Sequence, residues 1–149
     1  MARFHFRLAT LLRLREATRD ERRSALAQAC HAEELLRVKQ EELGSELATL
    51  ADFCRHTCAA DEFDIDAMLA ARRYEMVLRV QLSHLGRQRE AIGEEIERRR
   101  QALVEATREV RVLEQLRQRQ QERHREAEER QEIKQMDDLA GRRWRREVG

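Results

Sequence analysis

Apolar residues recur at alternating intervals of three and four along the first third of the chain. Steps of this size from residue 8 to residue 57 visit fifteen positions, of which nine are apolar. Such spacing places side chains on one face of a helix and is typical of a coiled-coil seam. It predicts a long helix over about residues 4–57. The apolar positions are Leu8, Leu12, Leu26, Ala29, Leu36, Leu43, Leu47, Leu50 and Cys54; the polar exceptions include Arg15, Arg19, Arg22, Glu33 and Gln40.

A second seam with the same spacing runs from Leu78 to Leu113. Nine of its eleven positions are apolar, and the two exceptions are Arg89 and Arg99. An arginine stem can lie along an apolar seam while its guanidinium reaches water. The pattern predicts a second helix over about residues 64–140. Its apolar positions are Leu78, Leu82, Leu85, Ile92, Ile96, Leu103, Ala106, Val110 and Leu113.

The segment between the two seams, residues 55–66, contains the one break that the pattern suggests. Thr57 and a cluster of acids weaken helix there, and Asp61 or Asp64 is a suitable N-cap for the second helix. We therefore expect a turn at about residues 58–63. Long helices joined by a short connection become antiparallel neighbours. The predicted fold is all-α, a single domain over residues 1–149 that forms a two-helix antiparallel coiled-coil hairpin.

The second helix is expected to overhang the first. A helix over residues 4–57 is ~80 Å long at 1.5 Å per residue, so the second helix reaches the level of residue 4 near residue 116. From residue 117 to residue 132 the only apolar residue is Ala127. Apolar residues return at Ile133, Met136, Leu139 and Ala140. Gly141 is a natural helix stop and would leave a basic tail, residues 141–149, that holds the only Trp.

Composition supports a rod rather than a thick-cored globule. Charged residues make up 40% of the chain, aromatic residues 4%, and there is no proline, as in long helices and coiled coils. A net charge of +1 favours neither nucleic acid nor an acidic membrane as partner. The charge is uneven: residues 1–30 carry +4, residues 31–70 carry −7 and residues 71–149 carry +4. We expect a soluble, reduced cytoplasmic protein without membrane insertion, because no signal-peptide pattern or apolar run of ~20 residues occurs.

The residues favour neither catalysis nor a bound cofactor. A Gly-rich phosphate loop, an H-E-x-x-H pair and a nucleophile elbow are all missing from the sequence, so no enzyme activity and no cofactor are predicted. Cys54 and Cys58, with His56 nearby, could be considered for zinc. They do not form a C-x-x-C pair, and a hairpin would keep Cys30 far from Cys58. No metal site is therefore predicted, and Cys54 is interpreted as a small seam residue.

Motifs at both ends resemble those of the FliJ proteins of bacterial flagellar export. The opening segment shares Phe4, Phe6, Leu8, Leu11, Leu12, Arg15 and Glu16 with that family. Leu113–Leu116 (LEQL) resembles its "L/A-E-K-L" stretch. Lys134, Asp137, Asp138, Leu139 and Ala140 resemble its "K-x-x-D-E-x-A" signature, with Asp138 in place of the usual Glu. The order and spacing of these motifs fit over essentially the whole chain.

The resemblance implies a stalk of the flagellar type III export apparatus, similar to the γ stalk of rotary ATP synthases. Such stalks insert into the hexameric export ATPase ring and promote its assembly and activity. They also contact the export gate membrane protein, escort export chaperones and associate peripherally with the inner face of the cell membrane. If the end that carries both termini binds the ATPase, the acidic turn end, with Phe53, Phe63 and Tyr74, is free to bind the gate or chaperones, although no family motif matches there. The candidate ATPase-binding residues are Arg3, Phe4, Phe6, Arg7, Leu8, Leu11, Ile133, Lys134, Met136, Asp137, Asp138, Leu139, Arg142, Arg143 and Trp144.

Several alternatives remain open at this point. The chain could be the equivalent stalk of a virulence type III secretion system, or a structural coiled-coil scaffold. The arginines of residues 142–146 could bind nucleic acid phosphates, although adjacent acids argue against this and no nucleic acid partner is expected. The aromatic residues at the terminal end could simply cap the coiled coil.

Overall fold

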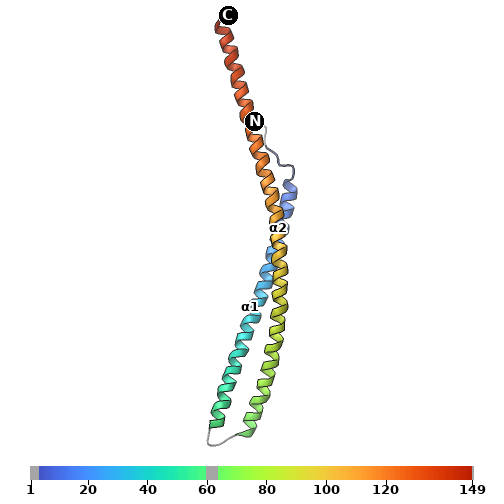
Figure 1. The fold of residues 1–149 in the computed structure, drawn as a ribbon, viewed down its shortest axis with the longest axis vertical. Coiled ribbons are helices and arrows are strands. Elements are labelled where there is room, and N and C mark those ends of the chain that lie inside the picture. Colours follow the sequence, from blue (N-terminus) through green and yellow to red (C-terminus); the bar gives the residue numbers. More distant parts are fainter. Residues whose placement is uncertain (1–3, 60–63, 149) are drawn as a thin grey trace. The chain divides into compact units, whose positions relative to one another are not determined.

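A computed structural model describes residues 4–59 and 64–148, which form two helices. Helix α1 spans Ala9–Ala59 and helix α2 spans Ile65–Val148 (Figure 1). The described residues contain no strand. The predicted all-α helical hairpin is confirmed. No proline interrupts either helix, which removes the residue that most strongly breaks a helix interior.

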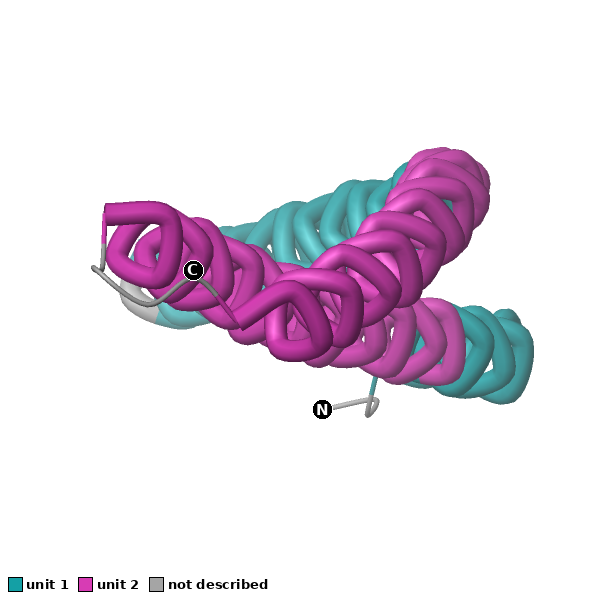
Figure 2. Tube along the Cα trace, turned by 90° about the horizontal axis from the view of Figure 1, so that it is seen from below, with its two compact units in different colours: residues 1–20, 104–149 teal, residues 21–103 magenta. Residues whose placement is uncertain are grey.

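The chain divides into two compact units, each of which contains part of both helices (Figure 2). Unit 1 comprises residues 1–20 and 104–149, and unit 2 comprises residues 21–103. In each unit the segments of α1 and α2 run in opposite directions (Figure 1). The assignment of the chain to a single domain stays a prediction.

Unit 2 is held together by the predicted seam. Leu78 is 1% exposed, and Ala29 and Leu43 are also buried. The other apolar seam positions within this unit are half-buried, as expected where only two helices share a narrow interface. Ala71 is buried although it lies before the predicted second seam begins. The heptad spacing therefore identified the side chains that lie between the helices of this unit.

Unit 1 has a small apolar core at the beginning of α1. Phe6, Leu12 and Val110 are buried together, and Val110 is 1% exposed. Arg15, a polar exception in the predicted seam, places its Nη1 2.8 Å from Oε2 of Glu109 on α2. The surrounding apolar side chains that pack against this core are Phe4, Ala9, Leu113 and Leu116.

The helix ends differ from the expected bounds. Helix α1 begins at Ala9 rather than near residue 4, because residues 4–8 form a non-helical arm whose Phe6 side chain enters the core of unit 1. Leu8 consequently precedes the helix and is 36% exposed. At the other end α2 continues to Val148, so the helix stop at Gly141 is wrong. Gly141 does not adopt the positive φ of a helix-terminating glycine.

Asp64 caps the beginning of α2. Its Oδ1 accepts hydrogen bonds from the backbone N–H groups of Asp66 and Ala67, both at 3.0 Å. These are two of the donors that have no partner within the first turn of a helix. Of the two predicted caps the structure selects Asp64, and Asp61 lies outside the described residues.

Candidate interaction surfaces

The last part of α2, residues 125–148, forms a helix that has no partner helix in unit 1. We call it the overhang. Within the described chain, no hydrogen bond, ion pair or ring contact joins these residues to another segment. Every residue from Gln131 to Ala140 is exposed. The sequence prediction that α2 runs past the beginning of its partner agrees with this arrangement.

Local ion pairs support the helix of the overhang where no seam exists. Nε of Arg125 lies 3.4 Å from Oε1 of Glu129, and Nη2 of Arg130 lies 3.6 Å from Oε2 of Glu126. Pairs at this spacing stabilise a helix by ~0.2–0.5 kcal/mol each. The overhang can therefore remain helical without burying an apolar stripe.

The overhang exposes large apolar side chains and a group of arginines. Ile133, Met136, Leu139 and Trp144 are each more than half exposed. Arg142 and Arg143 are also exposed and lie with Leu139 and Arg146 around a shallow depression of about 440 Å³. The remaining predicted ATPase-binding residues of this segment, Lys134, Asp137 and Asp138, are exposed as well. The structure thus places this whole set on one free helix.

The N-terminal members of the predicted set are divided between core and surface. Phe6 is buried, and the Phe4 ring packs edge-on against His124 of α2, with ring centroids 5.7 Å apart. These two aromatic residues therefore cap the packed part of unit 1, the alternative that the sequence left open. Arg7, Leu8 and Leu11 remain exposed, whereas Arg3 lies outside the described residues.

Unit 2 contains an open groove between α1 and α2 near the turn, here called the turn-proximal groove. Its volume is about 670 Å³. On α1 most lining side chains are small or apolar, including Gly44, Ala48 and Cys54, and Arg55 is the charged exception. Two arginines of α2, Arg72 and Arg79, form its rim and pair with Glu75 at 2.8 and 2.6 Å. Sequence periodicity did not predict this groove, although the run of small residues on α1 was visible.

Two of the predicted gate or chaperone residues lie in the described part of unit 2. Phe53 on α1 and Tyr74 on α2 are each 48% exposed, and no ring contact joins them. Phe63 lies outside the described residues. The Tyr74 hydroxyl donates a hydrogen bond of 2.9 Å to Oε2 of Glu46, which crosses from α2 to α1. This hydrogen bond, with the negative charge of Glu46, raises the pKa of Tyr74 above its usual value of 10.0.

Neither metal binding nor membrane crossing finds a candidate site in the described part of the chain. Residues 4–59 and 64–148 hold no group of three or more His, Cys, Asp or Glu side chains arranged to bind a metal. Cys54 is half-buried at its seam position, and Cys30 and Cys58 are exposed. In the same residues, neither helix has a stretch both long and apolar enough to cross a bilayer.

The arrangement defines a class of protein: an all-α hairpin with a narrow coiled-coil seam and one unpaired helix end. The model of the family described as Flagellar FliJ protein matches residues 4–149, which is essentially the whole chain, and the protein belongs to this family. It is accordingly a component of the flagellar type III export apparatus. No curated relative and no solved structure matches the chain.

Proposed function

We propose that the protein is a non-catalytic stalk that binds the hexameric export ATPase through the overhang of α2. Binding of this surface inside the ring promotes the assembly and activity of the ATPase. The observation that carries the proposal is the exposure of Ile133, Met136, Leu139 and Trp144, each more than half exposed, on the overhang. One of these side chains, Leu139, belongs to the signature that resembles the family's, and all four are more than half exposed.

Burial of these side chains in a partner would supply a substantial part of a binding free energy. Transfer of a large apolar side chain out of water is worth ~1.5–3 kcal/mol when burial is complete. Trp and Arg are the residue types most often found at the energetic centre of protein interfaces. Trp144 lies among Arg142, Arg143, Arg145 and Arg146, a combination that suits a partner with an apolar pocket and nearby carboxylates.

The exposed part of the N-terminal end, with Arg7, Leu8 and Leu11, extends the proposed ATPase-binding surface. Phe4 and Phe6 support this surface from within, because they hold the arm against α2. Their substitution should therefore reduce ATPase binding indirectly, through loss of the packed arm.

The turn-proximal groove and the neighbouring Phe53 and Tyr74 form the proposed surface for the export gate membrane protein or export chaperones. The groove offers an apolar floor and a rim of arginines, which suits an amphipathic helix with acidic flanks. Contacts at this surface and at the overhang would link the ATPase to the gate. The protein would then act at the cytoplasmic face of the membrane by peripheral association.

A comparison of two matched surface variants tests the ATPase assignment. One variant carries Ile133→Ser, Met136→Ser, Leu139→Ser and Trp144→Ser. The control carries Ile65→Ser, Leu69→Ser, Met76→Ser and Val80→Ser, which are exposed apolar residues of unit 2. Purified export ATPase is mixed with each protein, and ring formation and ATP hydrolysis are measured. Circular dichroism verifies that both variants keep their helicity.

We expect the wild-type chain and the control to stimulate hydrolysis, and the overhang variant to lose at least tenfold in apparent affinity. A loss of ~1.4 kcal/mol in binding free energy corresponds to that factor. Truncation after Glu132 should have the same effect. Equal stimulation by the overhang variant and the control would show that the ATPase binds elsewhere.

A further inference from the structure

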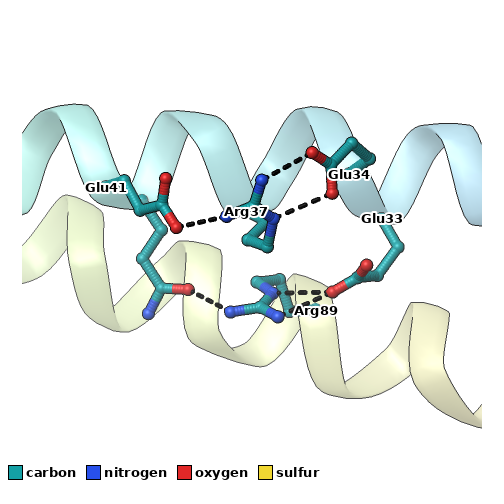
Figure 3. Close-up of polar contacts among 6 residues, drawn as sticks. Glu33, Glu34, Arg37, Glu41 and Arg89 are labelled. Carbon is teal, nitrogen blue, oxygen red and sulfur yellow. Dashed lines mark hydrogen bonds and ion pairs between the residues drawn. The ribbon is translucent and has the colours of Figure 1, made fainter.

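Two of the polar exceptions in the α1 seam and one in the α2 seam meet in a single network within unit 2 (Figure 3). Nε and Nη2 of Arg89 both donate to Oε1 of Glu33, at 3.1 and 2.6 Å. Nη1 of Arg89 donates to Oε1 of Gln40 at 2.8 Å. The Arg89 side chain is 35% exposed and that of Glu33 is 28% exposed. A partly desolvated guanidinium therefore connects α2 to two separate turns of α1.

We propose that Arg89, Glu33 and Gln40 form a register lock, which specifies how far α2 is displaced along α1 in the pairing of the two helices. A polar residue at a seam position can fix the register of a coiled coil at a cost in stability. The three residues fulfil the geometric requirement for this role, since their hydrogen bonds cross from one helix to the other.

The spacing of the two acceptors makes the lock sensitive to slippage in both directions. Glu33 and Gln40 are one heptad apart, and the seam positions one heptad beyond them are Leu26 and Leu47. A slip of one heptad therefore leaves Arg89 opposite one acceptor and one leucine. When Gln40 loses Arg89, it lies beside Leu82 of α2. When Glu33 loses Arg89, it lies between Ile96 and Leu103, near Arg99, whose Nε is bonded to Glu95 on its own helix. Each slipped pairing thus loses a hydrogen bond of Arg89 at a partly desolvated seam position, which is unfavourable.

The leucine positions alone would discriminate poorly between these registers. Leu36, Leu43 and Leu50 of α1 repeat at intervals of seven, as do Leu78 and Leu85 of α2, so a slip by seven residues again places leucine against leucine. Such degeneracy is the reason that coiled coils require a polar or charged residue to select one pairing. In unit 2 the register lock supplies that selection.

Arg99 provides an internal comparison, because it also crosses between the helices. Its Nη1 donates to the backbone carbonyl oxygen of Ala25 at 2.5 Å, while its Nε donates to Glu95 on its own helix at 2.7 Å. Every residue of α1 carries a backbone carbonyl, so this contact does not depend on the side chain that it meets. Arg99 can hold the helices together without selecting a register.

Arg37 provides the second comparison. It forms hydrogen bonds of 2.8 and 2.6 Å with Glu34 and a further bond with Glu41, all within α1 (Figure 3). The network resembles that of Arg89 in residue types but does not reach α2. Arg37→Leu is therefore a matched control for the loss of an arginine network that has no influence on register.

Distance measurements between two spin labels test the proposal directly. The labels are attached at Ser24→Cys on α1 and Val80→Cys on α2, both exposed positions of unit 2 that are staggered along the helix axis, so that a slip changes their separation. The background carries Cys30→Ser, Cys54→Ala and Cys58→Ser. A slip of one heptad moves α2 by ~10.5 Å along α1, which pulsed electron paramagnetic resonance resolves. Sedimentation velocity identifies any pairing between molecules.

We expect one distance in the background protein and in its Arg37→Leu and Arg99→Leu variants. Arg89→Leu should add a second distance, because the ratio of native to slipped pairing falls by about three- to tenfold, the factor expected for loss of a charged hydrogen bond at a side chain that is 35% exposed and screened by solvent. The triple variant with Arg89→Leu, Glu33→Leu and Gln40→Leu should have a melting temperature equal to or higher than that of the background protein. Glu33→Arg alone, or Arg89→Glu alone, places two like charges at the seam and can disturb the pairing. The double variant that carries both substitutions exchanges the two charges and should again give a single distance.

A single unchanged distance in Arg89→Leu would overturn the proposal. So would a second distance that appears equally in Arg37→Leu or Arg99→Leu, since the effect would then come from general destabilisation. If Arg89→Leu fails to fold, the charge-reversed pair decides: recovery of a single native distance supports the lock, and failure to recover it contradicts the lock.

Discussion

Leu78 offers the sharpest test of the packing in unit 2. Its side chain is 1% exposed, although only two helices are available to cover it. Leu78→Ala removes the equivalent of three methylene groups, each worth ~0.8 kcal/mol when buried. The transfer contribution alone is therefore about 2.4 kcal/mol. A core cavity usually adds to this cost, but water can enter a narrow two-helix interface, so we expect a total loss of ~2–3 kcal/mol.

Met76→Ala is a matched control two residues away. It removes the same number of heavy atoms from the same helix, and Met76 is 69% exposed. Leu and Met have similar helix propensities, so the two substitutions differ mainly in burial. The control should change the free energy of unfolding by less than ~0.5 kcal/mol.

Urea denaturation followed by far-ultraviolet circular dichroism measures both variants. A loss of ~2–3 kcal/mol also lowers the melting temperature by ~4–12 °C in a chain of this length. Equal effects of Leu78→Ala and Met76→Ala would refute the reasoning, because burial between α1 and α2 would then not decide the cost. A larger effect of Met76→Ala would point to a different face of α2 as the packed one.

Three further predictions concern single residues. Trp144 is the only tryptophan and is 69% exposed, so its emission maximum should be nearly the same in native and urea-unfolded protein; a clear red shift on unfolding would contradict a free overhang. Tyr74, the only tyrosine, should titrate above its usual pKa of 10.0 because of Glu46, and Glu46→Gln should lower that pKa in an absorbance titration. Since the folded-state pKa is raised, the contribution of this hydrogen bond to stability is present below pH 10 and lost as pH rises through the folded-state pKa. Gly141→Ala should increase helicity and stabilise the overhang by up to ~1 kcal/mol, because Gly141 is helical and a methyl group there would meet open space; reduced helicity by circular dichroism would argue against this.

The seam and the hairpin could be predicted from sequence because they depend on periodicity, which is a local property. Apolar spacing identified the buried Leu12, Leu43, Leu78 and Val110. The pairing of Arg89 with Glu33 and Gln40 could not be predicted in the same way, because periodicity gives the face of each helix but not which residues lie opposite each other. All three polar positions were visible only as exceptions to the apolar spacing.

The ends of the helices were harder to predict for physical reasons specific to each. Phe6 is buried although it precedes α1, since a non-helical arm can direct an aromatic side chain into the core of unit 1. Gly141 does not terminate α2, because the cost of one glycine in a helix is only ~1 kcal/mol and residues on both sides favour helix. The sequence thus placed the beginning of α1 too early, because packing of Phe6 keeps the arm out of the helix. It placed the end of α2 too early, because the helix propensity of the flanking residues outweighs the cost of Gly141.

Hydrogen–deuterium exchange of the protein, free and in complex with the export ATPase, tests the central claim most directly. Residues 125–148 have no partner helix in unit 1, so their amides should exchange faster than those of the packed segments in the free protein. Addition of the ATPase should slow exchange most strongly in residues 133–148. Protection confined to residues 65–80, or a binding event that leaves the overhang unprotected, would contradict the account.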